Sequence, residues 1–197
     1  ICGRVGLGAN FNGTPMTTYS QNGYTLFLAK LDCNGNLLWM RTAGGNRGLN
    51  QANSLALDGQ GHVYLTGVID ALTTEPVTFM DSTIAETAVD MFLAKFDTAG
   101  NFKWVRWAAK GSAQCGSIGL KVRKDPQGNV KVMGICAIAG VLFPGFNIPL
   151  SSFIATFDTS GIMIGYSMIS PVSLYKSILD YAIHPITGDQ YVTGKFS

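Results

Sequence analysis

Residues 27–39 read FLAKLDCNGNLLW, and this pattern returns twice farther along the chain. Residues 92–104 repeat it as FLAKFDTAGNFKW, and residues 153–161 keep a shorter version, FIATFDTSG. The copies are separated by roughly 60 to 67 residues, a spacing typical of repeat proteins in which each unit buries its face against the next. The sequence therefore predicts a repeat architecture that extends over the whole chain.

Each copy predicts a β-hairpin. From Phe27 to Leu31 the side chains alternate with a period of two, as in a strand with one face inward. Asp32 can accept backbone N–H bonds from the turn that it opens, and Gly35 supplies the positive φ that the turn needs. Trp39 begins the returning strand, where its large apolar area suits it to lie flat across the neighbouring unit as a spacer. The residues that carry this structural repeat are Asp32, Gly35, Trp39, Asp97, Gly100, Trp104, Asp158 and Gly161.

A second kind of hairpin alternates with the first. It is expected at residues 54–67, 118–135 and 177–196, with Asp58, Asp125 and His184 at the starts of the turns. Residues 70–88 resemble an insertion with a short strand at Val77 to Met80. Strands and tight turns in this order predict an all-β fold, a β-propeller built from four-stranded antiparallel blades.

The chain is expected to hold about three blades in one propeller segment, residues 1–197. The repeats fall at approximately residues 1–67, 68–134 and 135–194. Propellers usually need four to eight blades, and both ends of the sequence lie inside a repeat pattern. We therefore expect the remaining blades to belong to the same protein or to a partner chain.

Composition argues for a hairpin-rich β protein and against several partner classes. Charged residues make up 13% of the chain, and Gly accounts for 24 of 197 residues. A net charge of +2 without a basic run argues against nucleic acid, although Lys121, Arg123, Lys124 and Lys131 form a modest basic patch. The sequence contains no run of 18 apolar residues, so it predicts no membrane-spanning segment.

The sequence offers no candidate catalytic, cofactor-binding or metal-binding residue. The aspartates recur with turns rather than with a histidine or a second carboxylate, so turn capping is favoured over catalysis. The cysteines lack the C-x-x-C spacing of a zinc site, and free or incidentally paired thiols are favoured over a disulfide framework. We therefore expect a non-enzymatic protein. The cysteines are Cys2, Cys33, Cys115 and Cys136.

Three aromatic side chains are candidates for a binding surface: Trp107, Phe143 and Phe146. Trp107 adds a second indole to its copy, where a buried spacer is the alternative to a ligand-stacking role. Phe143 and Phe146 lie in an apolar loop that is expected to pack on a blade edge or on a partner. The long loops at residues 6–23, 70–88 and 137–151 are expected to offer a variable binding surface.

The motifs Asp-x-x-Gly-Asn-x-x-Trp and His62 to Gly67 resemble the bacterial β-propeller repeat called SBBP. The Ala29, Asp32, Gly35 and Trp39 set is also similar to the tryptophan-docking hairpin of quinoprotein propellers, apart from one residue of spacing. No quinone-binding residue matches, so this resemblance implies no cofactor. The SBBP resemblance implies a secreted or cell-surface protein, with export by the type IX route as one possibility.

These observations favour an extracellular scaffold or adhesin that binds protein or glycan through its loops. Two other classes stay open. One is a secreted glycoside hydrolase or lyase whose active site lies on blades outside this segment. The other is a scaffold subunit of a larger secretion or surface assembly.

Overall fold

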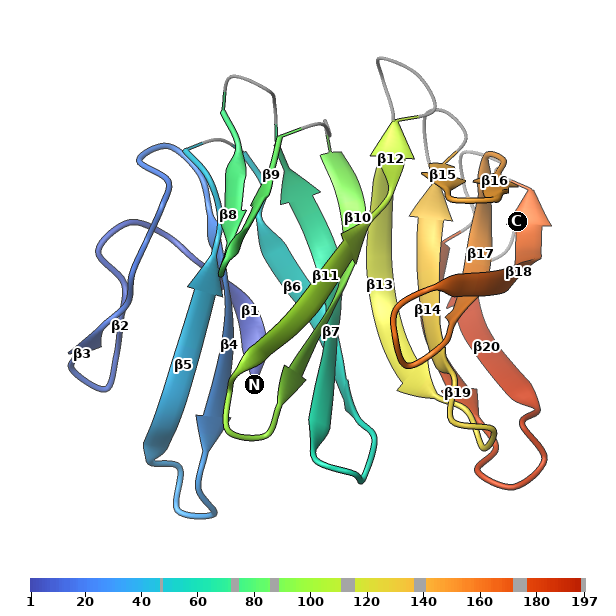
Figure 1. The fold of residues 1–197 in the computed structure, drawn as a ribbon, viewed down its shortest axis with the longest axis horizontal. Helices are drawn as coiled ribbons and strands as arrows, with labels where there is room; N and C mark the ends of the chain where they lie inside the picture. The colour runs from blue at the N-terminus through green and yellow to red at the C-terminus, as the bar shows by residue number, and fades with distance from the viewer. Residues whose placement is uncertain are drawn as a thin grey trace.

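A computed structural model describes residues 1–46, 48–71, 75–85, 89–110, 116–136, 141–171 and 177–195. All secondary-structure elements named in these ranges are β-strands, and these strands pair with one another antiparallel (Figure 1). The all-β prediction is therefore confirmed, and the expected hairpins at 24–43 and 89–108 are present. No described segment forms a helix long and apolar enough to cross a membrane.

The longer strands form four successive sheets, which stand side by side in chain order (Figure 1). The first contains β1 (Cys2–Val5), β4 (Thr25–Leu31) and β5 (Leu37–Ala43). The second contains β6 (Gln51–Leu57), β7 (His62–Asp70), β10 (Val89–Asp97) and β11 (Phe102–Trp107). The third contains β13 (Ser117–Lys124), β14 (Val130–Cys136), β17 (Ser151–Phe157) and β18 (Met163–Pro171), and the fourth contains β19 (Ser177–Ile183) and β20 (Gln190–Lys195).

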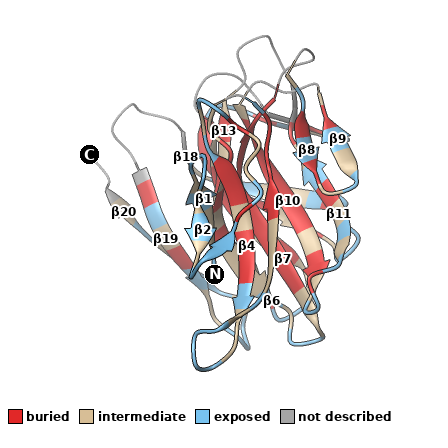
Figure 2. Cartoon of the chain, turned by 90° about the vertical axis from the view of Figure 1, so that its left-hand side faces the viewer, coloured by how far each residue is buried: buried red, intermediate tan, exposed pale blue. Residues whose placement is uncertain are grey.

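The hydrophobic core lies between the sheets, and β10 contributes to two parts of it. Phe92, Ala94 and Phe96 belong to the core between the first and second sheets. Met91 and Leu93, which alternate with them along β10, belong to the core between the second and third sheets. Figure 2 shows the resulting run of buried residues along β4, β7 and β10. Central strands with two buried faces explain the low charge content of the chain.

A short hairpin is inserted between β1 and β4 in the first sheet, between β7 and β10 in the second, and between β14 and β17 in the third. The prediction of a strand at Val77 to Met80 is confirmed, but its partner strand and the matching hairpins elsewhere were not predicted. The inserted hairpins are β2 (Asn10–Phe11) with β3 (Thr14–Pro15), β8 (Val77–Phe79) with β9 (Ser82–Ile84), and β15 (Val141–Phe143) with β16 (Phe146–Ile148).

Two of these hairpins form backbone hydrogen bonds with residues that follow the last strand of the preceding sheet. Thr78 of β8 exchanges two backbone hydrogen bonds with Gly44, directly after β5, at 3.0 and 2.9 Å. In the next repeat β15 pairs with β12 (Ala109–Lys110), which follows β11 after one residue. An inserted hairpin thus ties its own sheet to the outer strand of the sheet before it.

The same hairpins are packed rather than freely exposed. Phe79, Ile84 and Ile148 are fully buried, and Phe143 is 6% exposed. The β8–β9 and β15–β16 strands within the 70–88 and 137–151 loops therefore contribute side chains to the core. The expectation that these loops offer a variable binding surface stays a prediction. Within the apolar 141–149 segment, Phe143 and Ile148 pack into the core of the chain itself.

Candidate functional site

Each repeated tryptophan lies against a glycine turn of the following sheet. A Cβ atom built on Gly100 would be only 2.8 Å from the Trp39 ring, and one built on Gly161 would be 2.9 Å from the Trp104 ring. The Trp39 Nε1–H also donates to the carbonyl of Thr98 at 3.2 Å. Both tryptophans therefore lie against the sheet that follows their own, and a side chain at either glycine would clash with the indole ring.

An arginine reinforces each of these contacts. Arg41 lies over the Trp39 ring, 5.7 Å from the ring centroid, and its Nε donates to the carbonyl of Gly100 at 2.8 Å. Arg106 repeats this over Trp104, at 5.3 Å, and donates to the carbonyl of Ser160 at 3.2 Å. Sequence reasoning missed these arginines, although each stands two residues after its tryptophan.

The repeated aspartates cap their turns. The Oδ1 atom of Asp32 accepts the backbone N–H groups of Asn34 and Asn36 at 2.9 and 2.8 Å. Asp97 and Asp158 accept the corresponding two bonds in their own turns. In each turn a side-chain hydrogen bond is the main cause that lowers the pKa of the aspartate below its ordinary value. These carboxylates are committed to turn geometry.

Both histidines also serve turns. His62 pairs with the cap of its own turn, because its Nδ1 lies 2.7 Å from Oδ2 of Asp58. In the last hairpin the His184 ring replaces the aspartate, and its Nδ1 accepts the backbone N–H groups of Ile186 and Thr187 at 3.4 and 3.1 Å. The turn role predicted for His184 is therefore confirmed.

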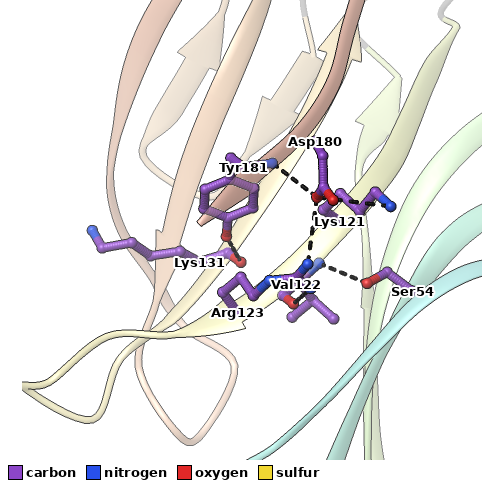
Figure 3. Close-up of polar contacts among 7 residues, drawn as sticks. All are labelled: Ser54, Lys121, Val122, Arg123, Lys131, Asp180 and Tyr181. Carbon is purple, nitrogen blue, oxygen red and sulfur yellow. Dashed lines mark hydrogen bonds and ion pairs between the residues drawn. The ribbon is translucent and has the colours of Figure 1, made fainter. Parts of the chain in front are cut away.

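The basic patch is occupied by contacts within the chain (Figure 3). Lys121 and Arg123 on β13 face Asp180 on β19, at 3.7 and 3.4 Å. The Tyr181 hydroxyl donates to the carbonyl of Lys131 on β14 at 2.7 Å. On the other side of β13, the Val122 N–H donates to the Ser54 hydroxyl at 3.2 Å. These contacts tie the second, third and fourth sheets together.

A surface hollow of about 460 Å³ brings together two of the three predicted binding residues. Trp107 and Phe143 line it. Phe146 lies outside and packs edge-on against Tyr166, with the two ring centroids 6.3 Å apart. Phe143 is nearly buried and packs edge-on against Phe157, with the ring centroids 5.4 Å apart. We name this the β11 hollow; its walls are Val105, Arg106, Trp107, Phe143, Pro144, Gly161, Ile162 and Met163.

Most of the β11 hollow was not predictable. Its walls come from β11, the β15–β16 hairpin and the turn before β18, which meet only in the folded chain. The apolar wall residue Ile162 has 60% of its surface exposed. Ile162 directly follows the turn glycine Gly161, and this is the sequence signal that could have indicated an exposed apolar residue at the hollow.

The described residues show no cluster of three or more histidine, cysteine or acidic side chains that could hold a metal ion. Cys2 and Cys33 are free thiols, Cys136 is buried, and Cys115 lies outside the described residues. Burial raises the pKa of Cys2. Neither a protein-family model nor a curated protein matches the chain.

Proposed function

We propose that the chain is a non-enzymatic β-propeller module of an extracellular or cell-surface protein, acting as a scaffold or adhesin. In this proposal the second and third sheets are complete blades, and the first and fourth belong to blades completed by other strands. The remaining blades come from the same protein or from a partner chain.

Two observations support the blade arrangement. The first strands of successive sheets lie next to each other, because β13 contacts β6 on one side and β19 on the other. The tryptophan docking also recurs with the same geometry at two successive interfaces. Equal interfaces between equal units generate a regular rotation about an axis, as in propellers. The SBBP-like pattern supports a secreted or cell-surface setting.

The β11 hollow carries the binding part of the proposal. Its volume falls within the about 300–1,000 Å³ that is typical of ligand pockets. Its apolar walls with Arg106 among them suit a sugar ring, which presents a C–H face and polar edges. We therefore favour a glycan as the ligand of this surface.

Glycan-array binding by the wild type and two isoleucine variants tests the proposal. Ile162→Arg places a long charged side chain in the hollow, whereas Ile164→Arg changes an isoleucine outside it that is 51% exposed, against 60% for Ile162. We expect the wild type and Ile164→Arg to bind the same glycans and Ile162→Arg to lose them. Absence of glycan binding by the wild type, or equal binding by both variants, would contradict a role for this hollow.

A further inference from the structure

A second hollow, of about 370 Å³, opens between the first and second sheets. Trp39 and Lys30 of the first sheet form one wall, and β6 and β7 of the second sheet form the other. We name it the Trp39 pocket; the residues that matter here are Leu28, Lys30, Trp39, Leu55, Leu57 and Val63.

The corresponding place between the second and third sheets holds the side chain of Tyr64. This residue is fully buried on β7, with its ring centroid 6.2 Å from that of Trp104. The ammonium groups of Lys95 and Lys124 lie 5.3 and 5.7 Å from the Tyr64 ring. Val122 and Val130 belong to the same buried cluster. One aromatic ring therefore fills this interface.

Strand register shows that the two places are equivalent. Lys30 lies opposite Trp39 in the first sheet, as Lys95 lies opposite Trp104 in the second. On the other wall, Leu57 pairs with Val63 as Lys124 pairs with Val130. Leu55 lies two residues before Leu57, and Val122 lies two residues before Lys124, so each pair shares one face of its strand. The Trp39 pocket thus has the walls of the Tyr64 site.

The register also defines how a ring would enter the pocket. Tyr64 lies opposite Lys95, one residue before Leu65, which lies opposite Ala94. In the first sheet Ile1 takes the place of Leu65, because it exchanges backbone hydrogen bonds with Ala29 at 2.8 and 2.9 Å. A strand that continues this pairing places its next side chain opposite Lys30, facing the pocket.

We propose that the Trp39 pocket is a receptor for an aromatic side chain carried by a β-strand that pairs with β4 opposite Lys30. Lys30 and Trp39 supply the cation and the indole that Tyr64 meets in its own site, and these favour an aromatic ring over an aliphatic chain. Leu57 stands where Lys124 stands, so the pocket is more apolar and accepts phenylalanine as well as tyrosine. The proposal goes beyond glycan binding and depends only on how the sheets pack.

Extending the chain before Ile1 tests the proposal directly. Adding Gly-His-Val-Tyr, the sequence of residues 61–64, presents a tyrosine in the required register. Matched extensions that end in alanine or leucine control for added backbone pairing and for general hydrophobicity. Urea unfolding measures the equilibrium constant, and nuclear Overhauser contacts to the Trp39 indole locate the added ring.

We expect the tyrosine extension to lower the unfolding equilibrium constant by about tenfold to a hundredfold relative to the alanine extension. The leucine extension should be stabilised less than the tyrosine extension, relative to the alanine extension. The added tyrosine ring should give nuclear Overhauser contacts to the Trp39 indole that the leucine and alanine side chains do not give. Equal unfolding curves for the tyrosine and alanine extensions would overturn the proposal. Equal stabilisation of the wild type by free p-cresol would also overturn it, because the pocket would then be a site for small aromatic molecules.

Discussion

Replacing Gly100 by alanine probes the contact between the first and second sheets. Gly100 has a φ of 84°, and a Cβ added there would lie 2.8 Å from the Trp39 ring. Gly35 holds the same place in the preceding turn with a φ of 85°, but a Cβ there would meet nothing within 4 Å. Gly35→Ala is therefore a control that shares the backbone strain and lacks the clash.

The expected losses follow from these two terms. Left-handed backbone costs a non-glycine residue about 1–2 kcal/mol, and both variants incur this. Gly100→Ala also displaces a ring that is held by its hydrogen bond to Thr98, and overpacking of this kind costs about 1–3 kcal/mol. We therefore expect Gly100→Ala to lose about 1–3 kcal/mol more than Gly35→Ala.

Urea unfolding, followed by circular dichroism, measures this difference. With an m-value of about 2 kcal/mol/M the two midpoints should differ by about 0.5–1.5 M. In a Trp39→Ala background the extra cost of Gly100→Ala should disappear, which a double-mutant cycle detects. Equal losses for Gly35→Ala and Gly100→Ala in the wild-type background would refute the docking account.

Three further predictions concern titration and buried hydroxyls. Burial raises the pKa of Tyr64 to about 12, so the free energy of unfolding should fall as the pH rises from about 10 to about 12, and Tyr64→Phe should weaken this fall in urea titrations. The Tyr64 hydroxyl has no hydrogen-bond partner among the described residues, so Tyr64→Phe should not lower the free energy of unfolding at pH 7. Tyr181→Phe removes the hydrogen bond to the Lys131 carbonyl and should lower the free energy of unfolding by about 1 kcal/mol. Equal losses for the two variants would contradict the difference in hydrogen bonding. A side-chain hydrogen bond from Asn101 lowers the pKa of Asp97. The ionised Asp97 carboxylate therefore stabilises the fold fully above about pH 4, and this stabilisation is lost as the pH falls further. Asp97→Asn should lose less stability than the wild type on acidification, and equal losses in thermal melts would argue against the cap.

Local chemistry made the repeated hairpins predictable. Alternation from Phe27 to Leu31, a turn aspartate and a turn glycine specify a hairpin within a few residues, and the structure places β4 and β5 there. Trp39 was predictable as a spacer because its recurrence fixed its place in the unit. Short-range signals of this kind do not depend on the rest of the fold.

Contacts between distant segments were not predictable. The pairing of Thr78 with Gly44 joins two loop-like stretches that carry no matching pattern in the sequence. Burial of Phe143 depends on Phe157, which approaches it only once β17 is in place. The β11 hollow arises in the same way, because three separate segments form its walls.

The chemical shifts of three turn glycines test the central claim of repeated tryptophan docking most directly. An indole stacked on a glycine shields the Hα that points into the ring. We predict that one Hα proton each of Gly100 and Gly161 resonates well upfield of both Hα protons of Gly35, with nuclear Overhauser contacts to Trp39 and Trp104 respectively. Ordinary, equal Hα shifts at all three glycines would contradict the account.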